Sequence, residues 1–191
     1  MTSDEALMLE FQGGSRAAFE ELFARYRKPL RGFFERRLND RERAEDLAQE
    51  TFLALIRAAS RYEPRASVQT YLYGIALKLL AAERRKFLTS STLGQSALEP
   101  RTGGTPECGL WIRQAMEKLD APEREILMLR EYEQLSYSDI AELLRIPVNT
   151  VRSRLFRSRL ALKSYLESDA KPNPALRANA GQPHPGRRGM Q

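Results

Sequence analysis

Apolar residues recur at helical spacing along most of the chain, and no stretch alternates apolar and polar residues as a half-buried strand would. A clear example runs from Phe19 to Tyr26, where large apolar residues fall at positions i, i+3, i+4 and i+7, the stripe of a helix packed on a core. The pattern and its Gly, Asn, Asp and Pro interruptions predict helices over residues 4–12, 15–38, 41–60, 67–87, 107–119, 122–133, 136–144 and 147–168. The chain is therefore expected to be all-α.

A change in composition divides these helices into two sets. Of the 22 residues from 88 to 109, 13 are Gly, Pro, Ser or Thr, and such a segment buries too little apolar surface to order itself. The end of the chain is rich in Pro and in basic residues and is expected to be disordered. The sequence thus predicts two small helical domains, residues 1–87 and 110–168, joined by a flexible linker over 88–109 and followed by a basic tail over 169–191.

The second helical set contains the pattern of a helix-turn-helix. A short apolar helix is followed by a tight turn at residues 145–146, and Pro147 then opens a longer helix. Six basic residues and no acid lie between residues 145 and 163. Arginine can bridge the O6 and N7 atoms of guanine, and an aromatic edge can contact a thymine methyl group. The spacing favours a DNA-recognition helix over a solvated basic face, and its candidate contact residues are Asn149, Arg152, Ser153, Arg154, Phe156 and Arg157.

The predicted helix over residues 41–60 carries a cluster of acidic residues beside an apolar stripe. Acids in its first turn would face the positive end of the helix dipole, which explains Glu42 and Glu45 without any further role. Asp46, Gln49 and Glu50 lie too far along the helix for that explanation. Two interpretations stay open for this cluster, a solvated face and a protein-docking face.

The segment from Arg61 to Lys86 mixes aromatic with basic residues. Aromatic rings can stack on unpaired bases while cations follow the phosphate backbone, so this composition is typical of a surface that binds single strands. The competing interpretation is that some of the aromatic residues simply pack in the core. The candidate contacts are Tyr62, Arg65, Tyr71, Lys78, Arg84 and Arg85.

Charge and the counts of cysteine and histidine limit the classes of partner and site that this chain can have. The net charge of +6 is compatible with a polyanionic partner but does not identify one. The only cysteine, Cys108, allows no intramolecular disulfide, and it is either a bystander thiol or a redox sensor. The chain has no Gly-rich phosphate loop, no Cys/His set with metal-ligand spacing and a single histidine, His184, so no cofactor and no catalysis are expected. Without an N-terminal signal peptide or a long apolar run, it is expected to be cytoplasmic and not inserted in a membrane.

In this order and spacing, the motifs resemble the sigma-70 family of bacterial transcription initiation factors, in its small extracytoplasmic-function (ECF) class. Region 2 of that class is similar to AEDLAQETFLAL followed by YLYGIA, and its region 4 is similar to LSYSDIAELLRIPVNTVRSRLFRSRLAL. The resemblance implies a factor that binds core RNA polymerase and directs it to promoters, with an anti-sigma factor as its inhibitor. The alternative of a dimeric helix-turn-helix regulator lacks support, because no segment reads as a dimerisation helix or as a ligand-binding domain.

The resemblance also assigns roles by position. Contact with the clamp helices of the largest polymerase subunits would fall to Asp46, Leu47, Gln49, Glu50 and Phe52. The segment from Tyr62 to Lys86 would capture and melt the −10 element of promoter DNA as a single strand, and the helix-turn-helix would read the −35 element as a duplex. A promoter spacer of about 17 base pairs is about 58 Å long, within the roughly 70–80 Å that the linker can span.

Several positions differ from the usual pattern of that family, among them the loop over residues 62–65, which lacks the Gly-Asp that often follows its aromatic residue. Tyr71 stands where tryptophan is frequent, and Lys78 stands where asparagine is frequent in a base-reading position. Arg145 occupies the turn where glycine is frequent, which would cost stability if this residue takes a positive φ. The preferred −10 sequence of a relative is therefore not transferred to this chain.

Overall fold

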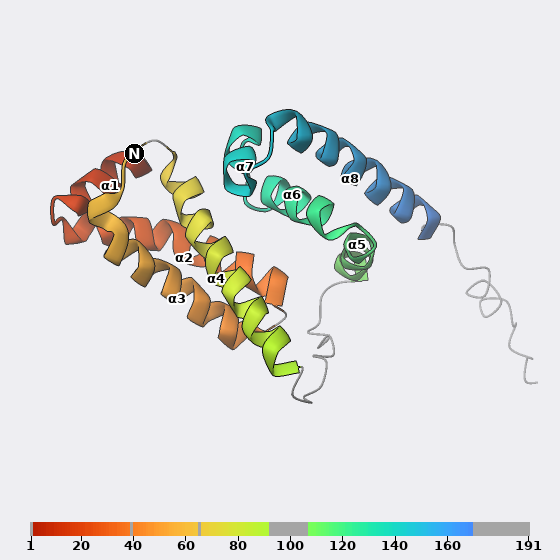
Figure 1. The fold of residues 1–191 in the computed structure, drawn as a ribbon, viewed down its shortest axis with the longest axis horizontal. Coiled ribbons are helices and arrows are strands. Elements are labelled where there is room, and N and C mark those ends of the chain that lie inside the picture. Colours follow the sequence, from red (N-terminus) through yellow and green to blue (C-terminus); the bar gives the residue numbers. More distant parts are fainter. Residues whose placement is uncertain (1, 39, 65, 92–106, 170–191) are drawn as a thin grey trace, which may run out of the picture.

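The computed structural model describes residues 2–38, 40–64, 66–91 and 107–169. These residues form eight α-helices and one short 3-10 helix and contain no strand, which confirms the all-α prediction (Figure 1). The elements are α1 (Asp4–Gln12), α2 (Arg16–Leu38), α3 (Arg41–Ala58), η1 (Ala59–Arg61), α4 (Val68–Ser91), α5 (Glu107–Glu117), α6 (Ala121–Glu131), α7 (Tyr137–Leu144) and α8 (Val148–Asp169). None of the described helices is long and apolar enough to cross a membrane.

The helix ends agree with the sequence pattern to within a few residues, apart from the borders of the predicted linker. α4 continues to Ser91, because neither Gly nor Pro occurs between Gly74 and Gly94, and α5 already begins at Glu107. The first residues of the predicted linker are therefore helical, and Cys108 lies in the first turn of α5. Residues 92–106 of the predicted linker and 170–191 of the predicted tail lie outside the described residues.

Helices α1 to α4 pack into the first of two helical groups (Figure 1). Polar side chains begin two of these helices: Ser3 accepts a hydrogen bond from the Ala6 N–H at the start of α1, and Asp40 accepts one from the Arg43 N–H at the start of α3. Between α1 and α2, Gly14 has a φ of +95°, a conformation that glycine adopts without steric cost. The apolar stripes meet in a core whose fully buried side chains include Leu22, Leu30, Phe33, Phe34, Leu47, Leu55, Leu72, Tyr73 and Leu80.

Helices α5 to α8 form the second group, in which α8 packs across α5, α6 and α7. Its core contains Ile126, Leu129, Ile140, Val151 and Leu155, all at most 1% exposed. The two groups also contact each other, because α7 lies against α4. At this contact a Cβ atom on Gly74 of α4 would lie 3.4 Å from Cδ2 of Leu143 of α7.

Candidate functional site

The turn between α7 and α8 has the geometry of a helix-turn-helix. A capping box starts α7: the Ser136 hydroxyl accepts from the Asp139 N–H at 3.1 Å, and the Asp139 carboxylate accepts from the Ser136 N–H at 3.0 Å. The helix ends at Leu144, and Arg145 caps it with a φ of 53°. The N–H of Ile146 then bonds to the Ala141 carbonyl at 3.0 Å, which closes the turn. Arg145 thus stands in the left-handed conformation in which an arginine is less favourable than a glycine.

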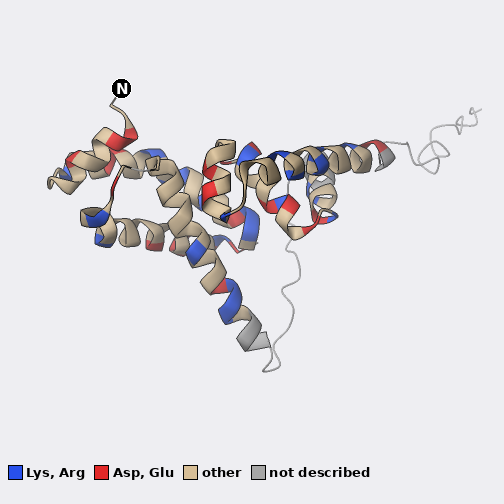
Figure 2. Cartoon of the chain, turned by 45° about the horizontal axis from the view of Figure 1, so that its top comes forward, with Lys and Arg blue, Asp and Glu red and all other residues tan. Residues whose placement is uncertain are grey.

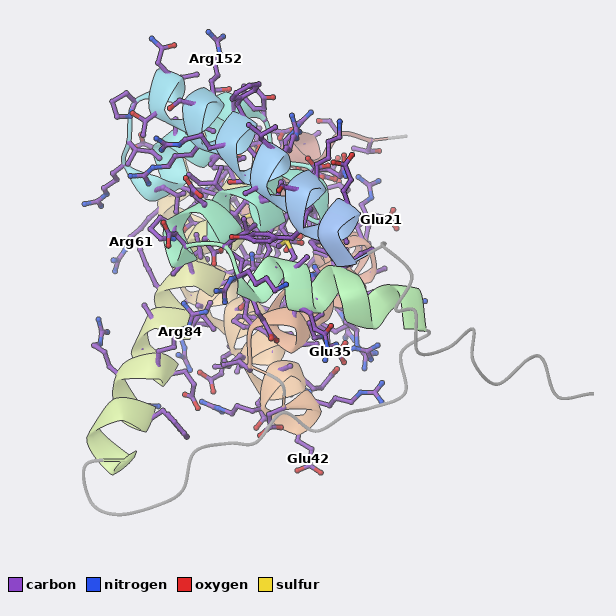
Figure 3. The ribbon with its side chains drawn as sticks, turned by 90° about the vertical axis from the view of Figure 1, so that its right-hand side faces the viewer. Glu21, Glu35, Glu42, Arg61, Arg84 and Arg152 are labelled. Carbon is purple, nitrogen blue, oxygen red and sulfur yellow. The ribbon has the colours of Figure 1, made fainter. Side chains whose placement is uncertain are left out.

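The outer face of α8 presents most of the predicted −35 residues to solvent. Val151 and Leu155 face inward at 0% and 1% exposure, whereas Phe156 on the opposite side is 68% exposed. Figure 2 shows the basic residues along this helix, and Figure 3 shows Arg152 projecting away from the rest of the chain. The exposed predicted residues are Asn149, Arg152, Ser153, Phe156 and Arg157, and Arg154 is half-buried.

Two residues that the sequence did not single out support this face from behind. The Glu123 carboxylate of α6 forms an ion pair with Arg157, with 3.2 Å between Oε1 and Nε. The carbonyl of the same glutamate accepts from the hydroxyl of Ser158, which is fully buried. Ser158 also donates to the Arg154 carbonyl at 2.7 Å. The one signal in the sequence for this contact is that Ser158 interrupts the apolar stripe of its helix between Leu155 and Leu162.

The predicted −10 residues divide into packed tyrosines and exposed cations. Tyr62 is 5% exposed, its hydroxyl donates to the Ala66 carbonyl at 3.2 Å, and its ring centroid lies 5.3 Å from that of Tyr71. Burial raises the pKa of Tyr62 above its usual value. In this arrangement the Tyr62 ring contacts protein, and Tyr71 is half-buried.

The exposed cations of this set lie on α4. Lys78, Arg84 and Arg85 are exposed. Because residues seven apart fall on nearly the same side of a helix, Tyr71, Lys78 and Arg85 share one face of α4. Arg65 lies outside the described residues.

The acidic cluster on α3 is joined to α4 by Arg43. This arginine contacts the carboxylates of Asp46 at 3.6 Å, Glu50 at 3.2 Å and Glu83 at 2.7 Å, and it also donates from Nη2 to Glu83 at 2.8 Å. The hydrogen bonds from Arg43 lower the pKa of Glu83, and the same bonds raise the pKa of Arg43. Of the predicted polymerase-binding residues, Asp46 and Gln49 are exposed and Glu50 is half-buried.

The other two predicted polymerase-binding residues, Leu47 and Phe52, are 1% and 3% exposed and pack inside the first group. The apolar part of the outer face comes instead from Leu53 and Ile56, which are 50% and 45% exposed. Beside these residues, a hollow of about 210 Å³ between α2 and α3 is lined by Phe23, Arg27, Glu45, Ala48, Gln49 and Phe52.

Comparison with known protein families matches both helical groups. The family model for Sigma-70 region 2 matches residues 22–86. The family model for Sigma-70, region 4 matches residues 109–162. The first match covers α2 to α4, and the second covers the helix-turn-helix. These matches fall on the two segments that carry the sequence resemblance.

Named relatives agree with these matches over most of the chain. The RNA polymerase sigma-H factor of Pseudomonas aeruginosa is 33% identical over 181 residues, which cover 86% of this chain and 94% of that protein. The ECF RNA polymerase sigma-E factor of Haemophilus influenzae is 31% identical over 183 residues, with 86% and 96% covered.

Solved structures share the fold at lower identity. CnrH, in a complex with the cytosolic domain of CnrY, superposes with a TM-score of 0.69 at 22% identity over 88% of this chain and all of CnrH. The sigma factor RpoE of Bartonella quintana, in a complex with the anti-sigma factor NepR, gives a TM-score of 0.65 at 23% identity over 79% of this chain and 98% of RpoE. Together with the family matches and the relatives, this places the chain in the sigma-70 family, as an ECF RNA polymerase sigma factor.

Proposed function

We propose that this sigma factor binds core RNA polymerase through α3, reads the −35 element through α8 and captures the −10 element through α4. The observation that carries the proposal is the outer face of α8, where Arg152, Ser153, Phe156 and Arg157 are exposed together directly after a helix-turn-helix turn. An exposed phenylalanine between arginines gains nothing for solubility, but it can contact a thymine methyl group in a major groove. The arginines beside it can read guanine or bind phosphate.

The polymerase-binding surface is the outer side of α3. It combines the carboxylates of Asp46 and Glu50 with the exposed apolar side chains of Leu53 and Ile56. Apolar residues at the centre with charged residues around them are typical of protein interfaces. The hollow between α2 and α3 lies next to this surface and offers room for a partner side chain.

The −10 surface is the face of α4 that carries Tyr71, Lys78 and Arg85. Cations at this spacing can follow a phosphate backbone while a half-buried ring stacks on a base. Extruding a base from the duplex costs a few kcal/mol, which such contacts offset. The lysine at position 78 replaces an amide that can read a base edge, so its contact is expected to be with phosphate.

In this proposal the chain carries out no chemical step itself, and the polymerase supplies the catalytic site. Its location would then be the cytoplasm, where the polymerase is. An anti-sigma factor is proposed as a further partner, since the structurally similar RpoE was solved with the anti-sigma factor NepR.

Binding to duplex DNA with and without core polymerase tests the proposal. A fluorescent promoter duplex is titrated with the chain alone, with sigma-free core polymerase alone, and with both together. We expect sequence-specific binding only when both are present. Tight, two-fold-symmetric binding by the chain alone would support a dimeric helix-turn-helix regulator instead.

A further inference from the structure

Two residues other than glycine take a positive φ in the described part of the chain, Gln134 at 56° and Arg145 at 53°. A side chain with a Cβ atom is disfavoured in this conformation, so each case needs a compensating contact. For Gln134 that contact is present, because its amide Nε2 donates to the Glu131 carbonyl at the end of α6 at 2.7 Å. The backbone of Arg145 caps α7, but a glycine would make the same cap without steric cost.

The side chain of Arg145 has no comparable contact inside the protein. Arg145 is exposed, and its guanidinium forms no hydrogen bond or ion pair with any residue that the structure describes. By contrast, Arg157 and Arg159 on α8 are paired with Glu123 and Glu131. A conformational cost that the fold does not offset is typical of a residue that is kept for binding. The contact that compensates Arg145 is therefore expected outside the chain.

Arg145 lies directly before the proposed recognition helix. Pro147 precedes the first residue of α8, and Asn149 is the first of the proposed −35 contact residues. Four residues of extended chain span at most about 14 Å, so the Cα atoms of Arg145 and Asn149 are no farther apart than that. The major groove is about 12 Å wide, and the phosphates of the two strands form its edges. When the start of α8 enters the groove, Arg145 is therefore placed at its edge.

The charge around this position favours an anion. Arg145 is the first of the six basic residues between residues 145 and 163, a stretch that contains no acid. The positive end of the α8 helix dipole lies three residues further along the chain. A guanidinium can donate two parallel hydrogen bonds to a phosphate, which makes this pairing both strong and directional.

We propose that Arg145 binds a backbone phosphate at the edge of the −35 element, and that its strained conformation is kept for this contact. This contact rests on the proposed function, because it requires α8 to lie in the major groove. Phosphate contacts carry no sequence information, but they fix the register and orientation of a protein on the duplex. Arg145 therefore adds affinity and orients α8, whereas Arg152 and its exposed neighbours read the bases.

The salt dependence of promoter binding by the holoenzyme tests this contact. Arg145→Gly removes both the charge and the strain, Arg145→Lys keeps both, and the matched control Arg113→Ala removes one charge from an exposed position on α5. Each phosphate contact contributes about 0.9 to the slope of log affinity against log salt. We expect the ratio of parent to Arg145→Gly affinity to fall about 3.5-fold between about 50 and 200 mM salt. The ratios for Arg145→Lys and Arg113→Ala should stay constant.

Two further measurements separate a DNA contact from other roles of the side chain. The melting temperature of free Arg145→Gly should be no lower than that of the parent, because the substitution removes strain. A lower melting temperature would assign the side chain a role inside the fold and overturn the proposal. Binding of Arg145→Gly to core polymerase without DNA should equal that of the parent. A loss there as large as the loss of promoter binding would place the guanidinium on the polymerase and also overturn the proposal.

Neutral phosphate analogues locate the contact on the DNA. Promoter duplexes carry an uncharged methylphosphonate at one position at a time along the −35 element and its flanks. We expect one position at which the replacement weakens binding by the parent and leaves binding by Arg145→Gly unchanged. If no position behaves in this way, or if Arg145→Gly binds the unmodified duplex as tightly as the parent at low salt, the phosphate contact is wrong and the proposed function stands. If the parent holoenzyme does not prefer an intact over a scrambled −35 element, the proposed function is wrong and the phosphate contact with it.

Discussion

Replacing single arginines on α8 should weaken promoter binding to different degrees. In the described part of the chain Arg152 makes no ion pair, whereas Arg157 is already paired with Glu123 at 3.2 Å. A lost base contact costs about 1–3 kcal/mol, so we expect Arg152→Ala to weaken binding by about 5-fold to 150-fold. Arg157 must give up an exposed ion pair of about 0.2–1 kcal/mol to reach DNA, so Arg157→Ala should cost less by that amount.

The assay is fluorescence anisotropy with holoenzyme and a promoter duplex at fixed salt, because phosphate contacts make every affinity depend on salt. The matched control is Arg16→Ala, which removes the same charge from a side chain that is 90% exposed on α2. A duplex with a scrambled −35 element separates base contacts from phosphate contacts. The reasoning fails if Arg157→Ala costs more than Arg152→Ala, or if both variants lose equal affinity on the intact and scrambled duplexes.

Three further predictions concern the polymerase surface, the α3–α4 pair and the turn. The double variant Leu53→Ser, Ile56→Ser should weaken core polymerase binding at least tenfold. Its helicity should stay unchanged, because both side chains are about half exposed. Unchanged affinity in a pull-down titration would remove this surface from the interface. Glu83→Gln should lower the free energy of unfolding by about 1 kcal/mol, because Arg43 holds the carboxylate in two hydrogen bonds and lowers its pKa. A carboxylate whose pKa is lower in the folded than in the unfolded state stabilises the fold at pH values above its unfolded pKa, near 4.5. The difference in urea midpoint between the parent protein and Glu83→Gln should therefore persist at pH 6–8 and shrink as the pH falls below about 4.5. A constant difference down to pH 3 would contradict this. Arg145→Gly should raise the melting temperature by a few degrees, since the φ of 53° at this position favours glycine. A lower melting temperature would show that the arginine side chain contributes more stability than the backbone strain costs.

The helices could be predicted from sequence because they follow local rules. Apolar periodicity and the Gly, Asn, Asp and Pro residues that interrupt it placed each helix to within a few residues. The sequence resemblance marked Arg145 as the turn position where glycine is frequent, and Arg145 does take a positive φ of 53° there. These features depend on residues that are close together in the sequence, so the sequence pattern contains them.

Burial in the candidate site could not be predicted from the same rules. Tyr62 and Tyr71 both lie in the mixed aromatic and basic segment, but Tyr62 is buried in the core whereas Tyr71 is only partly buried against it. Leu53 and Ile56 continue an apolar helix and yet face outward, because α2 and α4 cover only part of its circumference. The sequence does not distinguish Glu133 from the other acidic residues, because its partner Arg37 lies 96 residues away in the sequence. Such contacts depend on how the groups dock, and periodicity does not contain that information.

The central claim is tested most directly by sequencing the transcripts that the purified chain and sigma-free core polymerase make from the genomic DNA of its source. We predict discrete start sites that share upstream −35 and −10 motifs and that disappear when the chain is omitted. Starts without a shared upstream motif, or the same starts from core polymerase alone, would contradict the assignment of α8 and α4 to promoter recognition.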